Sequence, residues 1–373
     1  MKKDKVLLHG SYYGDNFGDT LFVILFTNWL KQYGIKSENI VTPFASNRVR
    51  SLIDVSKDSG IKTLDRCKVL VLMGGGYLGE PLSNRFRWSL RCLIRHMRLI
   101  IKANIKNIPY AFIGVGVGPI SSKLLRSLIV KVCNDSYFTV VRDIESKNYL
   151  IKYGVKEDKV VCSVDSILYL EHNNYEDFYS KNIKLSENIF KKENDTVYIG
   201  IHLPIYNSYG SELKNIINEI NEYCSDLKKY KLVLFNDFYK EGYDYKIKDA
   251  ILSRFDRQDI LEVPYTNPNQ MISLLNNLDI LITSKLHCGI VANCLNKYVI
   301  SIAEHSKTER LYKQLKLSHR SIMAYEYVNG DLLSLLKEYD KVEINKVVDD
   351  SIRKKAKSNR EYLFEFLQEN YRE

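Results

Sequence analysis

The feature that most constrains the fold is an alternation of short apolar segments with longer amphipathic segments, which runs along the chain twice. In the first half, apolar segments of strand length lie at residues 6–9, 68–73, 110–114, 137–141 and 159–162. In the second half they lie at residues 197–202, 232–235, 260–263, 279–283 and 298–302. Strands that alternate with helices form parallel sheets covered on both faces. The sequence therefore predicts an α/β protein with two successive sheets.

A polar stretch at residues 171–195, where the alternation stops, separates the two halves. The 373 residues are too many for one ordinary core and suit two domains. We predict a Rossmann-like domain with glycine-rich loops over residues 1–175, a second Rossmann-like domain over 195–345, and a C-terminal helix over 346–373. Two such domains with a cleft between them suggest a GT-B-like arrangement, in which, by analogy, the last helix returns to the first domain.

The composition excludes several classes of protein. Hydrophobic residues make up 45% of the chain and charged residues 27%, which is typical of globular proteins. The net charge of +10 admits anionic partners, but no basic block or aromatic-basic motif is present, so we expect no nucleic acid. The seven cysteines form no CxxC pair, and neither a signal peptide nor an apolar run of membrane-spanning length is found. We therefore expect a cytoplasmic protein with reduced thiols and no metal site.

Three glycine-rich loops, at residues 10–19, 74–79 and 114–119, each follow an apolar strand of the first half. Open α/β sheets bind ligands at the carboxyl ends of their strands, and glycines let backbone N–H groups approach an anion closely. The spacing matches neither the dinucleotide fingerprint nor the P-loop. We predict a ligand cleft here; the alternative is a set of tight turns, with Asp19 as a helix N-cap. The candidate ligand contacts in these loops are Asn16, Asp19, Gly74, Gly75 and Gly116.

Two further polar residues follow strands of the first half. Arg142 comes directly after the segment 137–141, and a guanidinium at that position is suited to bind a carboxylate or phosphate in a forked geometry. The alternative for Arg142 is a structural Arg–Asp ion pair. Asp165 follows the segment 159–162, where it either caps a short helix or faces the cleft.

The segment Thr-Ser-Lys-Leu-His at residues 283–287 lies where a strand of the second half becomes a helix. A phosphate near Lys285 would meet helix N–H groups and an ammonium together. His287 can move a proton near neutral pH. Lys307 follows the next strand and is expected at the same edge of the sheet. Further cleft candidates, for which a structural role is the alternative, are His202, Glu304 and His305.

These motifs together resemble those of the polysaccharide pyruvyl transferases. The matching pieces are the loop 10–19, the glycines at 74–76, the loop 114–119, the segment 141–146, residues 165–166, the segment 284–287 and Lys307. No single piece is specific, but their order and spacing are. The resemblance implies a GT-B-like enzyme that transfers the pyruvyl unit of phosphoenolpyruvate to two hydroxyls of one sugar, as a ketal, in exopolysaccharide or capsule biosynthesis. Phosphoenolpyruvate is then a co-substrate, and no cofactor is expected.

The resemblance also implies roles for individual residues. His287 matches the catalytic histidine, whereas Arg142, Lys285 and Lys307 match donor-binding positions. One position departs from the pattern, because the family commonly has Arg-Leu-His where this chain has Lys-Leu-His. Lysine keeps the charge but loses the fork that grips a carboxylate. Either Arg142 holds the carboxylate, or the donor sits differently, or the activity has drifted.

A basic stripe is predicted on a helix at residues 85–106. Arginine or lysine recurs every three or four residues, at positions 87, 91, 95, 98, 102 and 106, while apolar residues occupy other parts of the helix. Such a helix can lie on an anionic membrane. This would suit a lipid-linked oligosaccharide acceptor and a peripheral position at the inner face of the membrane. The alternative is a helix that packs on the sheet with a solvated cationic face.

Two other functions are compatible with the same fold. The first is a GT-B glycosyltransferase that uses a nucleotide sugar, although no base-binding or ribose-binding arrangement is evident in the second half. The second is a non-catalytic polysaccharide-assembly or binding protein, for which the lysine at position 285 is the only support.

Overall fold

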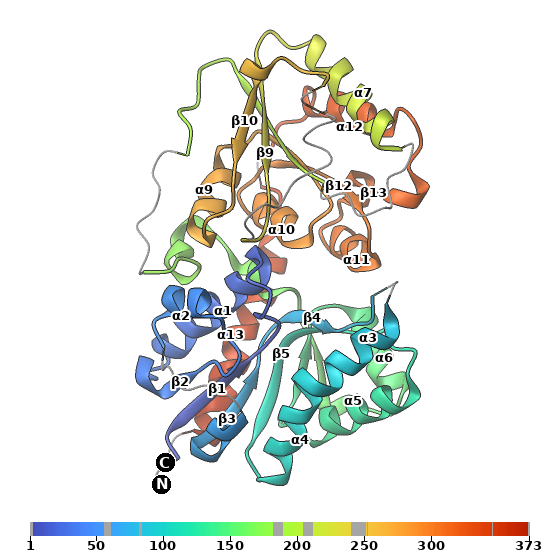
Figure 1. Ribbon diagram of the computed structural model, residues 1–373. Helices are drawn as coiled ribbons and strands as arrows, with labels where there is room; N and C mark the ends of the chain where they lie inside the picture. Colours follow the sequence, from blue (N-terminus) through green and yellow to red (C-terminus); the bar gives the residue numbers. More distant parts are fainter. Residues whose placement is uncertain are drawn as a thin grey trace. The chain divides into compact units, whose positions relative to one another are not determined.

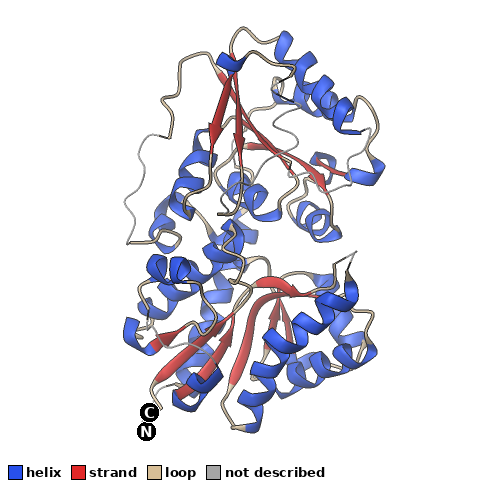
Figure 2. Cartoon of the chain, viewed as in Figure 1, coloured by secondary structure: helices blue, strands red, loops and turns tan. Residues whose placement is uncertain are grey.

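The computed structural model describes residues 3–55, 61–81, 84–181, 189–203, 212–239, 251, 253–344 and 346–371. The chain divides into two compact units, of which unit 1 comprises Met1–Ile183 and Asp350–Glu373 and unit 2 comprises Lys184–Asp349. Each unit contains one parallel sheet with helices packed on it (Figure 1, Figure 2). The prediction of an α/β fold with two Rossmann-like domains is confirmed.

Unit 1 is built on a seven-stranded sheet in the order β2-β1-β3-β5-β6-β7, with β4 paired to β5. Every strand pair is parallel. Because β1 is flanked by β2 and β3, its end marks the topological switch point of this sheet, where ligands bind in open α/β folds. The strands are β1 (Lys5–His9), β2 (Ile40–Val41), β3 (Cys67–Leu72), β4 (Gly75–Leu78), β5 (Tyr110–Val117), β6 (Thr139–Val141) and β7 (Val160–Cys162). The helices besides those described below are α1 (Phe17–Gln32), α2 (Asn47–Ile53), α5 (Lys123–Asp135) and α6 (Ile144–Lys152).

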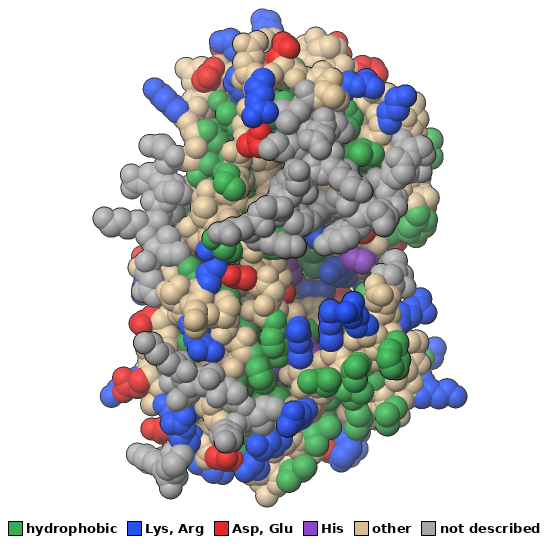
Figure 3. All heavy atoms as spheres, viewed as in Figure 1, with side chains coloured by type: hydrophobic (Ala, Val, Ile, Leu, Met, Phe, Trp, Pro, Cys, Tyr) green, Lys and Arg blue, Asp and Glu red, His purple; other side chains and the backbone are tan. Residues whose placement is uncertain are grey.

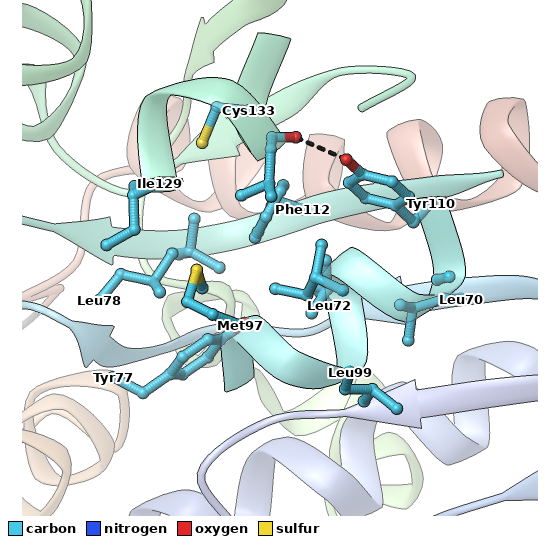
Figure 4. Close-up of a cluster of buried hydrophobic side chains, with 14 of the residues drawn as sticks. Leu70, Leu72, Tyr77, Leu78, Met97, Leu99, Tyr110, Phe112, Ile129 and Cys133 are labelled. Atoms are coloured by element: carbon cyan, nitrogen blue, oxygen red, sulfur yellow. Dashed lines mark hydrogen bonds between the residues drawn. The ribbon is translucent and has the colours of Figure 1, made fainter. Parts of the chain in front are cut away.

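An apolar core lies between one face of this sheet and the helices that cover it (Figure 4). Phe112 of β5 packs with Met97 and Ile129, which come from the helical segments on that face. Tyr110 is buried at the same layer, and its hydroxyl donates to the carbonyl of Val132 at 2.9 Å. The hydrogen bond removes the cost of burying that hydroxyl group.

The C-terminal helix α13 (Asp350–Asn370) belongs to unit 1 rather than to unit 2. It lies on the other side of the sheet from α4 and α5 (Figure 1). Asn359 donates to the carbonyl of Val164 at 3.0 Å, and the hydroxyl of Tyr371 donates to the carbonyl of Asp4 at 2.7 Å. Leu363 and Phe366 are fully buried in this contact. The return of the last helix to the first domain is the arrangement that the analogy with GT-B-like folds led us to expect.

Unit 2 is built on a six-stranded parallel sheet in the order β10-β9-β8-β11-β12-β13. Counted within the unit, this is the order 3-2-1-4-5-6 of the Rossmann fold, with its switch point between β8 and β11. The strands are β8 (Val197–His202), β9 (Tyr230–Phe235), β10 (Ile260–Val263), β11 (Ile280–Thr283), β12 (Tyr298–Ala303) and β13 (Ser321–Met323). The helices are α7 (Glu212–Ser225), α9 (Pro268–Asn277), α10 (Leu286–Cys294), α11 (Ser306–Gln314) and α12 (Asp331–Tyr339).

Two of the predicted loops are partly strands. Residues 75–78, expected to be a glycine-rich loop, form β4, and β5 continues to Val117 through the expected loop at 114–119. The sheet tolerates these glycines because Gly75 and Gly114, with φ of 128° and 74°, let the two strands change register. The short strands β2 and β13 were not predicted. The sequence pattern at residues 244–255 also predicts a helix, and this segment lies largely outside the described residues.

The helix predicted at 85–106 consists of α3 (Arg85–Cys92), a π-helical turn at Leu93–Met97 and α4 (Arg98–Ile105). The π turn inserts an extra residue, which rotates the side chains of α4 relative to those of α3. Within the parts of the chain that the structure describes, no helix is long and apolar enough to cross a membrane.

Candidate active site

The switch point of unit 2 brings together two of the predicted site segments. His202 ends β8, and Thr283 ends the neighbouring strand β11, so the two residues are partners in the sheet register. The Nδ1 atom of His202 lies 3.4 Å from the Thr283 hydroxyl, which in turn accepts a hydrogen bond from the backbone N–H of Lys285 at 3.0 Å. The end of β8 therefore helps to fix the chain where α10 begins.

Asp237, which follows β9, completes this arrangement. Its Oδ1 lies 3.5 Å from Nε2 of His202, whose buried ring also stacks on Phe235 with 5.0 Å between ring centroids. Burial of the Asp237 carboxyl would raise its pKa, but the close contact with His202 and the charge of Lys285 outweigh burial and lower the pKa. Asp237 is thus a carboxylate in a group that links β8, β9 and β11.

Lysines begin two neighbouring helices at this sheet edge. Lys285 is the N-cap residue of α10, and Lys307 lies in the first turn of α11, which follows the adjacent strand β12. Both lysines act on the side chain of His305. Burial, followed by the charges of Lys307 and Lys285, lowers the pKa of His305 to about 4. Because its imidazole is neutral near pH 7, the positive charge here comes from the two lysines.

The remaining predicted residues of unit 2 lie close along the chain to these lysines. His287 occupies the first turn of α10 and is half-buried. Ser284 is buried, and its hydroxyl has no hydrogen-bond partner within the described segments. Glu304, which directly follows β12, is also half-buried. Two helix N-termini, two ammonium groups and a buried hydroxyl form a setting suited to an anion such as a phosphate.

Cys288 is also part of this group of residues. Its thiol is fully buried, and burial together with the charge of Asp237 raises its pKa well above the usual value, although Lys285 acts in the opposite direction. The thiol therefore stays protonated and is poorly suited to be a nucleophile.

In unit 1, Arg142 lies at the end of β6 and is only 6% exposed. Its Nη1 donates to Asp165 at 3.0 Å, and its Nε lies 4.0 Å from Asp143. A Cβ atom at Gly116 would come within 2.8 Å of the Arg142 Nε, and one at Gly76 within 3.4 Å of Nη2. The structure therefore places Arg142 and Asp165 beside the glycines of β4 and β5. Arg142 and Asp165 form an ion pair, which is the kind of contact that the sequence offered as the alternative to donor binding.

The first loop of unit 1 reaches the second glycine segment. Asn16 is the N-cap residue of α1 and accepts from the Asp19 N–H at 2.9 Å, while its amide donates to the Asp19 carboxylate at 2.6 Å. The suggestion that Asp19 is itself the N-cap is wrong, because α1 begins at Phe17 and Asn16 is its N-cap residue. The Asp19 carboxylate would lie 4.0 Å from a Cβ at Gly75. A Cβ at Gly74 would come within 2.6 Å of Phe22, so only glycine fits there.

Sequence reasoning missed two polar groups near the strand ends. Asp237 lies two residues beyond the end of β9, and the rule that ligands bind at the carboxyl ends of strands would have selected it. In unit 1, Nε2 of His9 lies 2.9 Å from Nδ1 of His96 in a fully buried contact. No signal in the sequence links these two histidines, which are 87 residues apart and belong to β1 and the π turn.

Comparison with known proteins decides the family. The sequence profile of polysaccharide pyruvyl transferases matches residues 16–306. The chain belongs to the polysaccharide pyruvyl transferase family. The matched range includes the end of the first glycine loop, the other two glycine loops, Arg142 and the Lys285–His287 segment, and it ends one residue before Lys307. No curated protein matches the chain.

Several solved structures resemble this pyruvyl transferase family member along its whole length. A UDP-GlcNAc 2-epimerase from Neisseria meningitidis, bound to UDP-GlcNAc, aligns with a TM-score of 0.63 and 14% identity over 97% of this chain and all of the other. HepE of Anabaena in complex with UDP-glucose aligns with a TM-score of 0.59 and 10% identity over 98% of this chain and 99% of the other. At such low identity the likeness shows the fold alone, which is a pair of Rossmann-like domains of the GT-B type.

Proposed function

We propose that this protein transfers the pyruvyl unit of phosphoenolpyruvate to two hydroxyls of one sugar, with release of phosphate, during cell-surface polysaccharide biosynthesis. Family membership supports pyruvyl transfer in polysaccharide synthesis. The observation that carries the donor assignment is the pair of lysines, Lys285 and Lys307, at the starts of two adjacent helices of unit 2. Phosphoenolpyruvate carries a phosphate and a carboxylate, and this sheet edge offers cationic and N–H groups for both.

The proposed donor site lies within unit 2. The phosphate binds at the N-terminus of α10, near Lys285 and the buried hydroxyl of Ser284. Lys307, at the start of α11, supplies the second positive charge. The pair of His202 and Asp237 does not hold the donor but fixes the Thr283 hydroxyl and, through it, the backbone of Lys285. The predicted donor contacts of Arg142, Gly74, Gly75 and Gly116, and the predicted acceptor contacts of Asn16, Asp19 and Asp165, stay predictions.

The chemistry needs balanced movement of two protons. Protonation of the methylene carbon of phosphoenolpyruvate produces a methyl group and leaves C2 electron-deficient, so that a sugar hydroxyl adds to C2 and loses its proton. The bond between C2 and the phosphate oxygen then breaks, and phosphate leaves. The second hydroxyl adds to C2 and loses its proton, which closes the ketal. One hydroxyl proton thus replaces the proton used at the methylene carbon, and the other leaves with phosphate.

His287 is the proposed group for these proton transfers. It lies in the first turn of α10, two residues from the proposed phosphate contact Lys285. General acid–base catalysis by a positioned histidine contributes about 10²–10⁴-fold to a rate. The two ammonium groups stabilise the charge that develops on the departing phosphate.

Product analysis tests this function directly. The full-length protein is incubated with phosphoenolpyruvate and a panel of synthetic and lipid-linked glycosides, and the products are examined by mass spectrometry. Formation of a pyruvyl ketal on one glycoside, with an equal amount of phosphate released, is the expected result. Turnover of phosphoenolpyruvate to free pyruvate at the same rate with and without acceptor would contradict the proposal.

A nucleotide-sugar donor is the alternative to test, because the two structures compared above are complexes with UDP-GlcNAc and UDP-glucose. Thermal unfolding in the presence of phosphoenolpyruvate, UDP-GlcNAc and UDP-glucose separates the two donor classes. Bound ligand raises the unfolding temperature in proportion to the logarithm of its concentration over its Kd. We expect a rise with phosphoenolpyruvate only; a rise with a UDP-sugar only would favour a glycosyltransferase. No rise with any of them, together with no product, would favour a non-catalytic protein.

A further inference from the structure

We propose that the outer face of the helix formed by α3, the π turn and α4 is a docking surface for an anionic membrane. The surface, called here the arginine ridge, has an apolar row and basic residues beside it. The apolar row is Phe86, Leu90 and Ile94, and the basic residues are Arg87, Arg91, Arg95 and Arg98.

The apolar row is exposed in a way that packing within unit 1 does not explain. Phe86 is 84% exposed, Leu90 49% and Ile94 54%. They recur every four residues, so they lie along one side of the helix. Figure 3 shows green apolar side chains gathered beside blue basic ones over the part of unit 1 that contains α3 and its neighbouring helices. A contiguous apolar patch rimmed by charge marks an interaction site.

The same helix is held firmly by its inner face. Met97 and Ile100 are fully buried in the core of unit 1, and Trp88 and Leu93 pack against it. His96 contacts His9, and Arg95 lies over the Tyr13 ring at 4.7 Å from its centroid. The helix therefore packs on the sheet, as the sequence offered as an alternative, and still presents an apolar row outward. The ridge is a fixed surface of the folded unit.

The positive charge of this helix indicates that its partner is anionic. Residues 85–106 contain seven arginines and lysines and no aspartate or glutamate. Arg85 pairs with Glu80, and Lys106 pairs with Asp65. Among the residues that the structure describes, no acidic side chain forms an ion pair with Arg87, Arg91 or Arg98. A second copy of this chain would place arginines against arginines, so self-association through the ridge is disfavoured.

An anionic lipid surface satisfies both parts of the ridge. Phenylalanine, leucine and isoleucine side chains enter the boundary between headgroups and acyl chains, while arginines beside them reach the lipid phosphates. Each basic residue near an anionic membrane strengthens binding by roughly fivefold. The proposal concerns unit 1 alone and does not depend on the donor chemistry of unit 2.

Vesicle flotation with the full-length protein tests the ridge, using vesicles of phosphatidylcholine with and without phosphatidylglycerol. We expect binding only to vesicles that contain phosphatidylglycerol, and less binding as salt increases. The variant Arg91→Glu/Arg98→Glu should lose binding by on the order of tenfold or more. Phe86→Ser/Leu90→Ser should weaken binding at both low and high salt, since it removes the apolar contribution.

The matched control is Lys354→Glu/Lys357→Glu, which makes the same charge change at exposed positions of α13 in the same unit. This control should keep most of the binding, and unchanged thermal unfolding shows that each variant is folded. Absence of wild-type binding to phosphatidylglycerol vesicles at low salt would overturn the proposal. So would equal loss in the control, or a stable dimer in sedimentation that Phe86→Ser dissociates. Because no substrate is present, none of these outcomes bears on pyruvyl transfer.

Discussion

The Nε2 atom of His202, the last residue of β8, lies 3.5 Å from Oδ1 of Asp237, which lies two residues beyond the neighbouring strand β9. The other ring nitrogen faces the Thr283 hydroxyl, which holds the N–H of Lys285. A carboxylate is thereby connected, through a histidine and a threonine, to the backbone of the residue that precedes α10. The relationship suggests that Asp237 positions the proposed donor site without touching the donor.

The variant Asp237→Asn tests whether Asp237 positions the site, which would affect kcat, or binds the donor, which would affect the KM for phosphoenolpyruvate. Removing a negative charge near Lys285 favours an anionic donor, so the KM for phosphoenolpyruvate should stay the same or fall. Loss of the carboxylate's contact with His202 should lower kcat by about tenfold or more. Steady-state kinetics measure both values, with Asp226→Asn, at an exposed position of unit 2, as the control. A raised KM with unchanged kcat would contradict a positioning role.

Substitutions at Lys285 test what its departure from the family pattern means. Lys285→Arg restores the fork and should give equal or better turnover. Lys285→Ala removes a charged contact of roughly 1.5–3 kcal/mol and should raise the KM for phosphoenolpyruvate about tenfold or more. Lys228→Ala, at an exposed position of the same unit, should change neither constant. If Lys285→Ala has wild-type kinetics, the residue does not contact the donor.

The ion pair between Arg142 and Asp165 should contribute to stability. Both side chains are buried, so Arg142→Met leaves the Asp165 carboxylate buried without its cation and should lower the free energy of unfolding by about 3–5 kcal/mol. Gly116→Ala places a Cβ within 2.8 Å of the Arg142 Nε and should also be destabilising. Urea unfolding measures both effects. Wild-type stability in Arg142→Met would show that the pair carries little energy and would favour the predicted donor-binding role.

The buried histidines His9 and His96 should make stability depend on pH. Burial and the charge of Arg95 lower the pKa of His96 to about 3, and burial and His96 lower the pKa of His9. The unfolded chain therefore binds protons below about pH 6.5 while the folded protein does not, so stability is full above that pH and falls as the pH decreases. Each group contributes up to about 1.4 kcal/mol per pH unit in that range.

The variant His96→Phe checks this assignment. It keeps a ring against Tyr77, on which His96 stacks at 4.7 Å between centroids, but removes one titrating group. Between pH 7.5 and pH 5.5, the free energy of unfolding should decrease less in the variant than in the wild-type protein. Identical slopes for the two proteins would mean that His96 does not titrate in this way.

The sequence predicted the sheets well because buried parallel strands are continuous apolar runs bounded by polar segments. It failed where glycine interrupts such a run: β4 and the end of β5 were predicted as loops because glycine is weak evidence for a strand. It also predicted that Lys285 and Lys307 follow adjacent strands, which the pairing of β11 with β12 places at one sheet edge.

The parts that sequence did not predict depend on long-range packing. The contact of Arg142 with Asp165 joins residues that were identified separately, and only the pairing of β6 with β7 brings them together. The contact of His202 with Asp237 depends on β8 lying beside β9. The exposure of Phe86 arises because the other side of its helix fills the core, which periodicity alone does not distinguish from a helix with a single apolar face.

The central claim is that His287 transfers protons when phosphate is released from phosphoenolpyruvate in the presence of an acceptor. One measurement tests this claim most directly. Phosphate release is followed with phosphoenolpyruvate and the glycoside identified by product analysis, for the wild-type protein, His287→Ala and the control His319→Ala, which changes an exposed histidine of unit 2. We predict that His287→Ala lowers the rate by about 10²-fold or more while phosphoenolpyruvate still binds, and that His319→Ala behaves as the wild type. Wild-type release by folded His287→Ala would contradict the account.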